Sequence, residues 1–151
     1  MRVAVGFDHR GVKLRAAVLE ALAADGHEQV DLGAETDEVR IDYPVKANEV
    51  GSAVLDGRAE RGVLVCGSGV GASIAACKLH GIRAAICHDT YSAHQGVEHD
   101  DMNVLCLGSE IVGAALAGEL VRTFLAAQFA AEGRYLERLG MVEELEARGH
   151  G

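Results

Sequence analysis

The amino-acid sequence predicts an α/β fold in which a parallel sheet lies between two layers of helices. Two features of the sequence lead to this prediction. First, short apolar segments alternate along the chain with segments whose apolar residues recur at helical spacing. Second, the short segments are apolar almost throughout, which is typical of strands that are buried on both faces. Alternating strands and helices imply right-handed connections between neighbouring parallel strands.

Five short segments are predicted to be the strands of this sheet. They are residues 2–7, 29–32, 62–66, 83–87 and 103–107. A chain of 151 residues suits one domain, so we expect residues 1–151 to form a single unit. The prediction is therefore a three-layer α/β/α Rossmann-like fold with a five-stranded parallel sheet.

The predicted helices are located by apolar spacing and by residues that start or stop a helix. Leu14, Val18 and Leu22 recur every four residues, and Gly26 ends that helix. Pro44 suits the first turn of the next helix. Further helices are predicted over residues 72–79, 111–130 and 134–148. The helix over residues 111–130 is apolar around much of its circumference, which suits packing against a second copy of the chain.

The charge and hydropathy of the chain exclude several classes of partner. The formal net charge is −9, which disfavours nucleic acid and anionic membranes because both require a basic surface. No apolar run approaches the ~20 residues of a membrane-spanning helix, and the first residues lack a signal-peptide core. We therefore expect a cytoplasmic protein with reduced cysteines. A small anionic ligand stays compatible with this charge, since a few local cations outweigh the overall sign.

Polar residues follow the predicted strands at the points where the strands end. Asp8 and His9 follow the first strand, and Cys66 closes the third. His88 and Ser109 follow the fourth and fifth strands. The carboxyl ends of parallel strands share one edge of a sheet, and ligands of such sheets bind there. The sequence therefore predicts a functional site at this edge.

A glycine-rich loop, Gly67-Ser68-Gly69-Val70-Gly71, separates the third strand from the next helix. Glycines let the backbone approach a ligand closely, and free N–H groups at a helix start favour negative charge. The loop is predicted to bind a phosphate group or an oxyanion that forms during a reaction. Two alternatives remain open. Gly67, Gly69 and Ala72 also fit a loose dinucleotide-binding pattern, which would make the chain a nucleotide-binding module. The other alternative is a glycine turn without a ligand.

Cys66 is the candidate for the reactive residue. A thiol next to the start of a helix tends towards the thiolate, which is a competent base or nucleophile. The alternative is a small buried apolar residue, and this is the better interpretation for Cys77, Cys87 and Cys106. His99, in the loop predicted before the fifth strand, would either move protons near neutral pH or be solvated. No His, Cys and Asp set has the spacing of a metal site, so no metal is expected.

Four further residues have both a structural and a functional interpretation. Asp8 and His9 would either cap the helix that follows or contact a ligand. Arg134 and Arg138 are four residues apart, hence on one face of the last helix. They would either hold a phosphate group together or form surface ion pairs with neighbouring glutamates.

The ordered motifs resemble the ribose-5-phosphate isomerase B family, which includes the galactose-6-phosphate isomerases of the lactose pathway. The resemblance spans about residues 2–142. The matching motifs are Gly6–His9 with Gly11, Asp42–Pro44, Cys66–Gly71, Ile74–Ala76 with Lys78, Gly81–Ala84, Tyr91–Ala93, and His99 with Asn103–Leu105. Several motifs in one order are far more specific than a single glycine loop.

The resemblance implies an aldose–ketose isomerase, most directly one that interconverts D-ribose 5-phosphate and D-ribulose 5-phosphate. Cys66 would be the base that moves a proton between C1 and C2 of the open-chain sugar. The backbone of residues 67–71 would stabilise the cis-enediolate, with Ser68 at the family's Ser or Thr position. His99 would help to open the sugar ring. One base and one oxyanion hole suffice for this reaction, so no cofactor is expected.

The resemblance also implies how the substrate is held. Asp8, His9, Asp100 and Asn103 would contact the sugar. Arg134 and Arg138, together with His9, would bind the phosphate. The family's sites lie across a subunit interface, so we expect a homodimer or tetramer in which the helix over residues 134–148 packs on a partner subunit.

Three positions depart from the family's pattern. Tyr135 replaces a histidine before the last helix, and Glu110 stands where an arginine is common. Both changes remove positive charge expected near the phosphate. Asp100 replaces an asparagine and adds negative charge beside His99. These departures concern the identity of the sugar phosphate rather than the isomerase chemistry.

Overall fold

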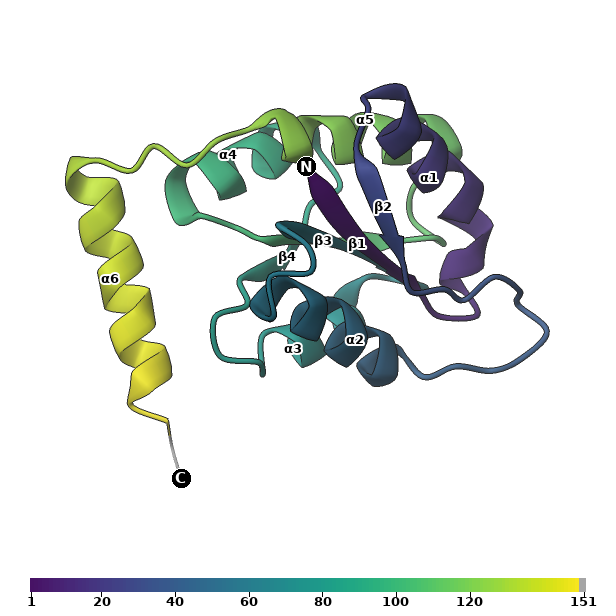
Figure 1. The fold of residues 1–151 in the computed structure, drawn as a ribbon, viewed down its shortest axis with the longest axis horizontal. Coiled ribbons are helices and arrows are strands. Elements are labelled where there is room, and N and C mark those ends of the chain that lie inside the picture. Colours follow the sequence, from purple (N-terminus) through teal and green to yellow (C-terminus); the bar gives the residue numbers. More distant parts are fainter. Residues whose placement is uncertain (150–151) are drawn as a thin grey trace.

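The computed structural model describes residues 1–149, which contain one sheet of five parallel strands (Figure 1). The strands are β1 (Arg2–Phe7), β2 (Glu28–Asp31), β3 (Arg61–Cys66), β4 (Ala84–Ile86) and β5 (Val104–Gly108). Their order across the sheet is β2-β1-β3-β5-β4, and every pairing is parallel. The predicted sheet is confirmed.

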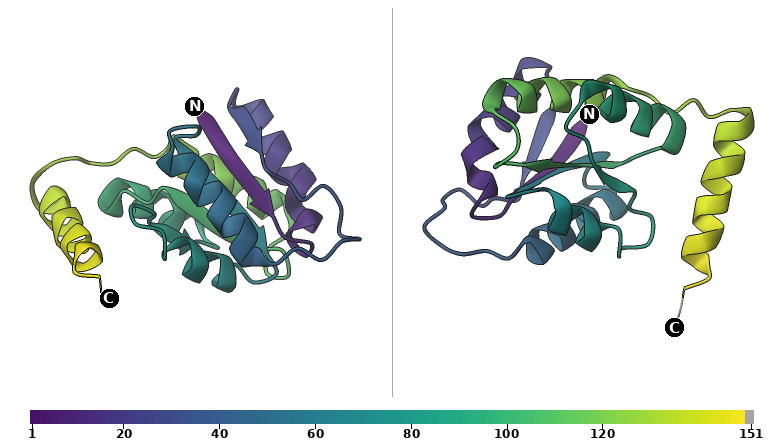
Figure 2. Two further views of the ribbon diagram at one scale, coloured as in Figure 1. Left: turned by 60° about the horizontal axis from the view of Figure 1, so that its bottom comes forward. Right: turned by 180° about the vertical axis from the view of Figure 1, so that it is seen from behind.

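Helices cover both faces of this sheet (Figures 1 and 2). They are α1 (Arg15–Ala24), α2 (Tyr43–Leu55), α3 (Val70–Ala76), α4 (Thr90–Asp100), α5 (Ala114–Ala126) and α6 (Gly133–Ala147), with a 3-10 turn, η1 (Gly11–Leu14), before α1. Helices α1, α4 and α5 pack on one face of the sheet, and α2 and α3 pack on the other. The three-layer α/β/α architecture is therefore confirmed.

Successive residues of the central strand β3 point into two different cores. Val63 and Val65 are buried among the residues of α1, α4 and α5. Leu64 and Cys66 are buried on the opposite face, with Ala72 and Ala76 of α3. This alternation is the ordinary consequence of the two-residue period of a strand. It directs the side chain of Cys66 towards the start of α3.

Helix α4 was not predicted, and His99 lies in this helix rather than in a loop. The segment is largely polar, and only Ala93 and Val97 of the helix are buried, so its apolar spacing is too sparse to indicate a helix. The Asp89 side chain accepts a hydrogen bond from the Ser92 N–H (2.7 Å) and so caps the helix start. The same N–H holds the pKa of the Asp89 carboxyl below its usual range.

Helix α5 is shorter than the predicted span of residues 111–130. The Arg61 guanidinium donates hydrogen bonds to the carbonyls of Phe124 (2.6 Å) and Ala127 (2.8 Å), which satisfies the end of the helix. Buried residues such as Leu120 pack inside the subunit, in contact with α1 and α4. The apolar face that we expected to meet a second copy is therefore already covered.

Helix α6 stands beside the layered body, at the end of an extended segment (Figures 1 and 2). No residue of this helix is buried. It contacts the body through its Tyr135 ring, which stacks on the His99 ring of α4 with 4.6 Å between centroids. Near its other end, the Glu146 carboxylate accepts a hydrogen bond from the Gly81 N–H (2.9 Å). Within residues 1–149, no helix is both long and apolar enough to cross a membrane.

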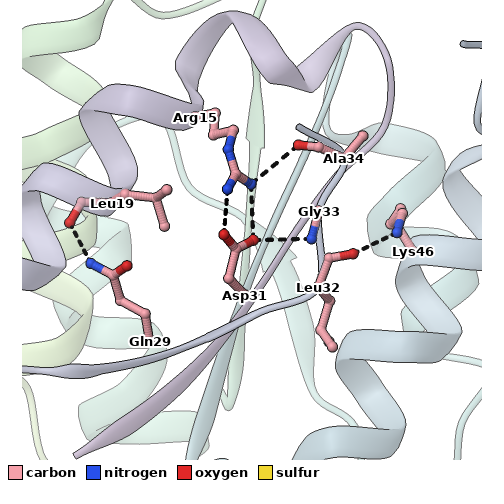
Figure 3. Close-up of polar contacts among 8 residues, drawn as sticks. All are labelled: Arg15, Leu19, Gln29, Asp31, Leu32, Gly33, Ala34 and Lys46. Atoms are coloured by element: carbon pink, nitrogen blue, oxygen red, sulfur yellow. Dashed lines mark hydrogen bonds and ion pairs between the residues drawn. The ribbon is translucent and has the colours of Figure 1, made fainter. Parts of the chain in front are cut away.

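A polar network fixes the segment that leaves β2 (Figure 3). The Arg15 guanidinium of α1 binds both carboxylate oxygens of Asp31 and the carbonyl of Ala34 (3.1 Å). Asp31 also accepts a hydrogen bond from the Gly33 N–H (3.0 Å). The hydrogen bond from Arg15 holds the pKa of the Asp31 carboxyl below its usual range. Lys46 of α2 donates to the carbonyl of Leu32 (2.6 Å), so both layers of helices hold this segment.

Candidate active site

The carboxyl ends of β1, β3 and β5 are joined by backbone hydrogen bonds just beyond the sheet. The Asp8 N–H donates to the carbonyl of Val65 (3.1 Å), and the Ser109 N–H donates to the carbonyl of Cys66 (2.8 Å). These bonds hold the polar segments that follow three neighbouring strands side by side. The edge at which the sequence predicts a site is therefore a real structural unit.

The glycine loop turns back so that its own backbone meets the thiol. Gly69 has a φ of +82°, a left-handed conformation that favours glycine, and it forms the N-cap of α3. Its N–H donates to the sulfur of Cys66, with 3.1 Å between nitrogen and Sγ. The Ser68 hydroxyl oxygen accepts the Val70 N–H (3.2 Å). An N–H directed at sulfur stabilises the thiolate form of a cysteine.

Two close approaches fix the position of this loop. The loop lies against the end of β5, where a Cβ added at Gly108 would be 2.7 Å from the carbonyl carbon and oxygen of Ser68. The ring of Tyr43 lies against Gly71, where an added Cβ would be 2.7 Å from Cζ of the ring. At Gly108 the neighbour is backbone, so packing requires a glycine there, whereas at Gly71 the neighbour is the outer end of the Tyr43 side chain. The loop is held rigidly between β5 and the start of α2.

Cys66 differs from the other cysteines in its surroundings. It is buried, but its sulfur has a hydrogen-bond donor. Cys87 and Cys106 are buried among apolar residues, and burial raises the pKa of the Cys87 thiol to about 11 and also raises the pKa of the Cys106 thiol well above its usual value. Cys77 is exposed at the end of α3. Only Cys66 combines burial at the edge of the sheet with a donor on its sulfur.

Asp8 and His9 are both engaged with backbone groups. The Asp8 side chain is buried and accepts a hydrogen bond from the Gly11 N–H (2.7 Å), so it supports the 3-10 turn η1. The His9 Nδ1 lies 3.1 Å from the carbonyl oxygen of Ile41 and accepts a hydrogen bond from the Ile41 N–H (3.3 Å). Neither contact uses Nε2, which donates or accepts according to the tautomer of the ring. Asp8 therefore has the capping role that was one of its two interpretations. His9 lines a cavity, where it is able to contact a ligand.

A cavity of about 500 Å³ opens beside these residues. Its walls come from the segment after β1, the loop after β2 and the segment after β5. They comprise His9, Arg10, Val12, Lys13, Glu35, Thr36, Asp37 and Glu110. The cavity is large enough for a small sugar phosphate. Across residues 1–149, no three His, Cys, Asp or Glu side chains are grouped so that they would hold a metal ion.

His88, at the end of β4, supports the same edge. Its Nε2 accepts a hydrogen bond from the Gly108 N–H (3.0 Å). Burial lowers the pKa of the His88 imidazole, which favours the neutral ring that this bond requires. His88 therefore positions the end of β5, against which the glycine loop packs.

The predicted residues His99 and Asp100 lie away from this edge. They are the last two residues of α4, which starts after β4 at the carboxyl edge and runs back along the sheet. Eleven helical residues span roughly 16 Å, so the two side chains lie near the opposite edge. Within one chain, His99 is thus separated from Cys66 by the length of a helix.

Asn103 and the two arginines are also distant from Cys66. The Asn103 side chain accepts the Arg83 N–H (2.7 Å) and donates to the carbonyl of Gly81 (2.8 Å), at the start of β5. Arg134 and Arg138 belong to α6. The chain thus brings together Asp8, His9, Cys66 and the glycine loop, and carries the other predicted site residues elsewhere.

Comparison with known proteins decides the family. Residues 3–142 match the model of a family described as Ribose/Galactose Isomerase. The chain belongs to this family. Ribose-5-phosphate isomerase B of Escherichia coli is 42% identical, and the match covers 97% of each chain. D-erythrulose-4-phosphate isomerase of Pectobacterium atrosepticum is 34% identical, again over 97% of each chain. The solved structure of ribose-5-phosphate isomerase B from Clostridium thermocellum has a TM-score of 0.93 at 40% identity, covering 98% of this chain and 99% of that one.

Membership of the ribose/galactose isomerase family confirms the resemblance found in the sequence. The chain is a sugar phosphate isomerase, and its glycine loop belongs to an isomerase domain. These comparisons give no support to the nucleotide-binding alternative. They leave open which sugar phosphate this family member converts, because its relatives carry different substrate names.

Two of the three positions that depart from the family's pattern, Glu110 and Tyr135, have partners within the chain. Glu110 binds the Lys13 ammonium (2.8 Å), and this hydrogen bond lowers the pKa of the Glu110 carboxyl. Tyr135 stacks on His99 and lies beneath the Arg134 guanidinium, 5.1 Å from the ring centroid. Both substitutions are therefore accommodated by local contacts.

Sequence reasoning gave no role to two residues at this edge. Tyr43 covers Gly71 of the loop, and the signs in the sequence are its place in the matching motif Asp42–Pro44 and at a helix start. Arg10 lines the cavity beside His9. It lies in the same short segment after β1, and its place between His9 and Gly11 is the sequence signal for its position at this edge.

Proposed function

We propose that the chain interconverts D-ribose 5-phosphate and D-ribulose 5-phosphate through a cis-enediolate, with Cys66 as the base. The observation that carries this proposal is the 3.1 Å contact from the Gly69 N–H to the Cys66 sulfur. Such a donor favours the thiolate, which is the form that accepts a proton from carbon. The names of the E. coli relative and of the solved C. thermocellum structure support ribose 5-phosphate as the substrate.

The proton transfers balance without a cofactor. The Cys66 thiolate removes the proton from C2 of the open-chain aldose, and the electron pair moves through C1 to O1. The O2 hydroxyl proton passes to O1, and the carbonyl forms at O2. The Cys66 thiol returns its proton to C1, which gives the ketose and regenerates the thiolate.

The glycine loop stabilises the enediolate oxygen in this scheme. The N–H groups of Gly71 and Ala72 belong to the first turn of α3, where backbone donors have no acceptor within the helix. The packing of Gly108 and Tyr43 against the loop fixes the directions of these donors. Fixed donors aimed at developing charge are worth about 10²–10³-fold in rate for each donor in comparable oxyanion holes.

A second copy of the chain completes the site in this proposal. His99 and Asp100, with Asn103 beyond them, would reach a bound sugar only from a partner subunit. On α6, Arg134, Arg138, Met141 and Leu145 are spaced by four, three and four residues, so they share one face. Met141 and Leu145 are 62% and 65% exposed. An apolar stripe that carries two arginines suits a helix that packs on a partner and presents its arginines to the phosphate.

A panel of aldose and ketose phosphates with four, five and six carbons tests the substrate. We expect the highest kcat/KM with the ribose 5-phosphate and ribulose 5-phosphate pair. A preference for a four-carbon substrate would move the assignment towards the relatives named D-erythrulose-4-phosphate isomerase. No interconversion of any member would contradict the proposed function.

Cys66→Ala tests the base, and Cys77→Ala is its matched control because Cys77 is exposed outside the glycine loop. We expect Cys66→Ala to lower kcat by at least about 10³-fold, since it removes the group that carries the proton. Its far-ultraviolet circular dichroism and Tm should show a folded protein. Cys77→Ala should retain wild-type kcat. Full activity of Cys66→Ala would overturn the assignment of the base.

A further inference from the structure

The side chain of Arg10 lies directly on the glycine loop. A Cβ added at Gly67 would overlap three atoms of the Arg10 side chain, namely Nε, Cζ and Nη1. Gly67 is the residue that follows Cys66 in the chain. A guanidinium is therefore laid against the first residue of the loop, in space that any larger side chain at position 67 would occupy.

In the part of the chain that the structure describes, this guanidinium makes no direct contact with an acidic group, although its charge lies close enough to Glu110 to help lower the pKa of that carboxyl. Other cations nearby are engaged, since Lys13 binds Glu110 (2.8 Å) and Arg15 binds Asp31. For Arg10, the backbone is held, because its carbonyl accepts the Ser109 hydroxyl (2.8 Å). Its guanidinium makes no hydrogen bond or ion pair within residues 1–149. The backbone is thus anchored and the cation is available.

The cavity beside Arg10 is lined by side chains of both signs. Arg10 and His9 come from adjacent positions and line it together. Of the other charged residues in its walls, Lys13 is paired with Glu110, whereas Glu35 and Asp37 would repel an anion. A phosphate group is therefore favoured next to Arg10 and His9. The planar guanidinium suits phosphate because it donates two parallel hydrogen bonds.

We propose that Arg10 binds the phosphate group of the substrate from the same subunit as Cys66. It supplies the positive charge that the family commonly carries at position 110, where this chain has a glutamate paired with Lys13. This assignment deepens the proposed function and rests on it. It makes Arg10 a specificity-determining residue, which selects phosphorylated sugars over neutral ones.

Arg10→Ala and Arg10→Gln test this role, with Arg58→Ala as the control. Arg58 is an exposed arginine in the turn before β3, at the other edge of the sheet. Losing a charge-assisted contact to a group that does not react raises KM by about 10–100-fold and changes kcat by less than about twofold. Arg10→Lys should recover part of this loss, since it keeps the charge but not the two parallel donors. Arg58→Ala should match the wild type.

Binding of inorganic phosphate gives a readout that does not need turnover. Titration calorimetry should give a dissociation constant that rises at least about tenfold in Arg10→Ala and Arg10→Gln. If the wild type converts sugar phosphates while both variants keep wild-type KM and phosphate affinity, the Arg10 proposal is overturned and the proposed function stands. If the wild type converts none, but its phosphate binding depends on Arg10, the proposed function fails and Arg10 remains an anion-binding residue.

Discussion

The carboxyl edge of the sheet and helix α6 carry the two halves of the proposed site, and they are built in opposite ways. At the edge, Cys66 is 4% exposed, and its loop is packed too closely on β5 to allow a side chain at Gly108. On α6, no residue is buried and Leu145 is 65% exposed. A packed loop holds its donors in fixed directions, whereas an uncovered helix takes its position from whatever it packs on. In the proposed site, the packed loop would supply the proton-transfer half and the exposed helix would supply the other half.

Among substitutions that leave the proposed base in place, the largest effect should come from loosening the packed half. Gly108→Ala places a methyl group against the Ser68 carbonyl and forces the loop away from its position. We expect kcat to fall about 10²-fold, as when one oxyanion donor is lost, and the free energy of unfolding to fall by about 1–3 kcal/mol. Steady-state kinetics and urea unfolding measure the two effects.

Gly118→Ala is the matched control for this change. Gly118 lies inside α5, and an added Cβ would be 3.9 Å from the nearest side-chain atom, the Cβ of Ala21. The substitution should leave kcat unchanged and raise the free energy of unfolding by up to about 1 kcal/mol, because alanine is the better helix former. Equal losses of kcat in both variants would show that the loop's position is not what catalysis needs.

A second change should affect association without disturbing the packed half. Leu145→Glu puts a charge on the α6 stripe that carries the arginines. We expect the dissociation constant of the oligomer to rise about 10–100-fold, while the Tm of the folded body changes little because nothing on α6 is buried. Activity should fall at low protein concentration and recover at high concentration.

Leu136→Glu provides the comparison on the same helix. Leu136 is 49% exposed but lies outside the stripe. Sedimentation velocity of the two variants should show weaker association for Leu145→Glu only. Wild-type association of Leu145→Glu would remove α6 from the proposed interface.

The polar network after β2 should have a moderate effect on stability alone. Asp31→Asn removes the charge that binds Arg15 (2.9 Å for one of the two contacts), so we expect a loss of about 1–3 kcal/mol at pH 7. The pKa of the Asp31 carboxyl is lowered in the folded state, so this stability is present above its ordinary pKa of about 4 and is lost as the pH falls through the lower folded value. The free energies of unfolding of the wild type and Asp31→Asn, measured with urea, should converge in acid. A difference between the two free energies that stays constant from pH 7 to pH 2 would contradict the ion-pair interpretation.

The smallest expected effect concerns His88. Burial lowers the pKa of its imidazole, so the unfolded chain binds a proton more readily than the folded one. The folded state is therefore penalised once the pH falls below the ordinary histidine value of about 6.5. Between pH 7.5 and about 5.5, the Tm of the wild type should fall more than that of His88→Gln. If the Tm of both proteins changes with pH in parallel, protonation of His88 does not contribute to the pH dependence of stability.

The sheet and the active edge could be predicted because they depend on local patterns. Buried parallel strands are continuous apolar runs, and the polar residues that follow them meet at one edge in any fold of this class. The glycine loop was predictable for the same reason, since Gly69 is needed for a left-handed backbone conformation.

The remaining features depend on contacts between distant parts of the chain. Helix α4 is polar, so its apolar spacing indicated nothing, and its end carries His99 away from the edge predicted for the site. The apolar face of α5 was expected to pack on a partner subunit, but its residues are buried in the subunit's own core. The side chain of Arg10, which follows β1, contacts Gly67, which follows the neighbouring strand β3, and no pattern along the sequence indicates such a contact.

Subunit mixing tests most directly whether two chains share one site. Cys66→Ala and His99→Asn should each be nearly inactive alone. If sites are shared, each mixed dimer would contain one site in which both residues are intact, with Cys66 from the His99→Asn chain and His99 from the Cys66→Ala chain. Its other site would carry both substitutions. If sites are shared, a refolded equimolar mixture should regain about a quarter of wild-type activity, because half of the dimers are mixed and each has one intact site. Activity no higher than the sum of the two separate variants would contradict a site built across the interface.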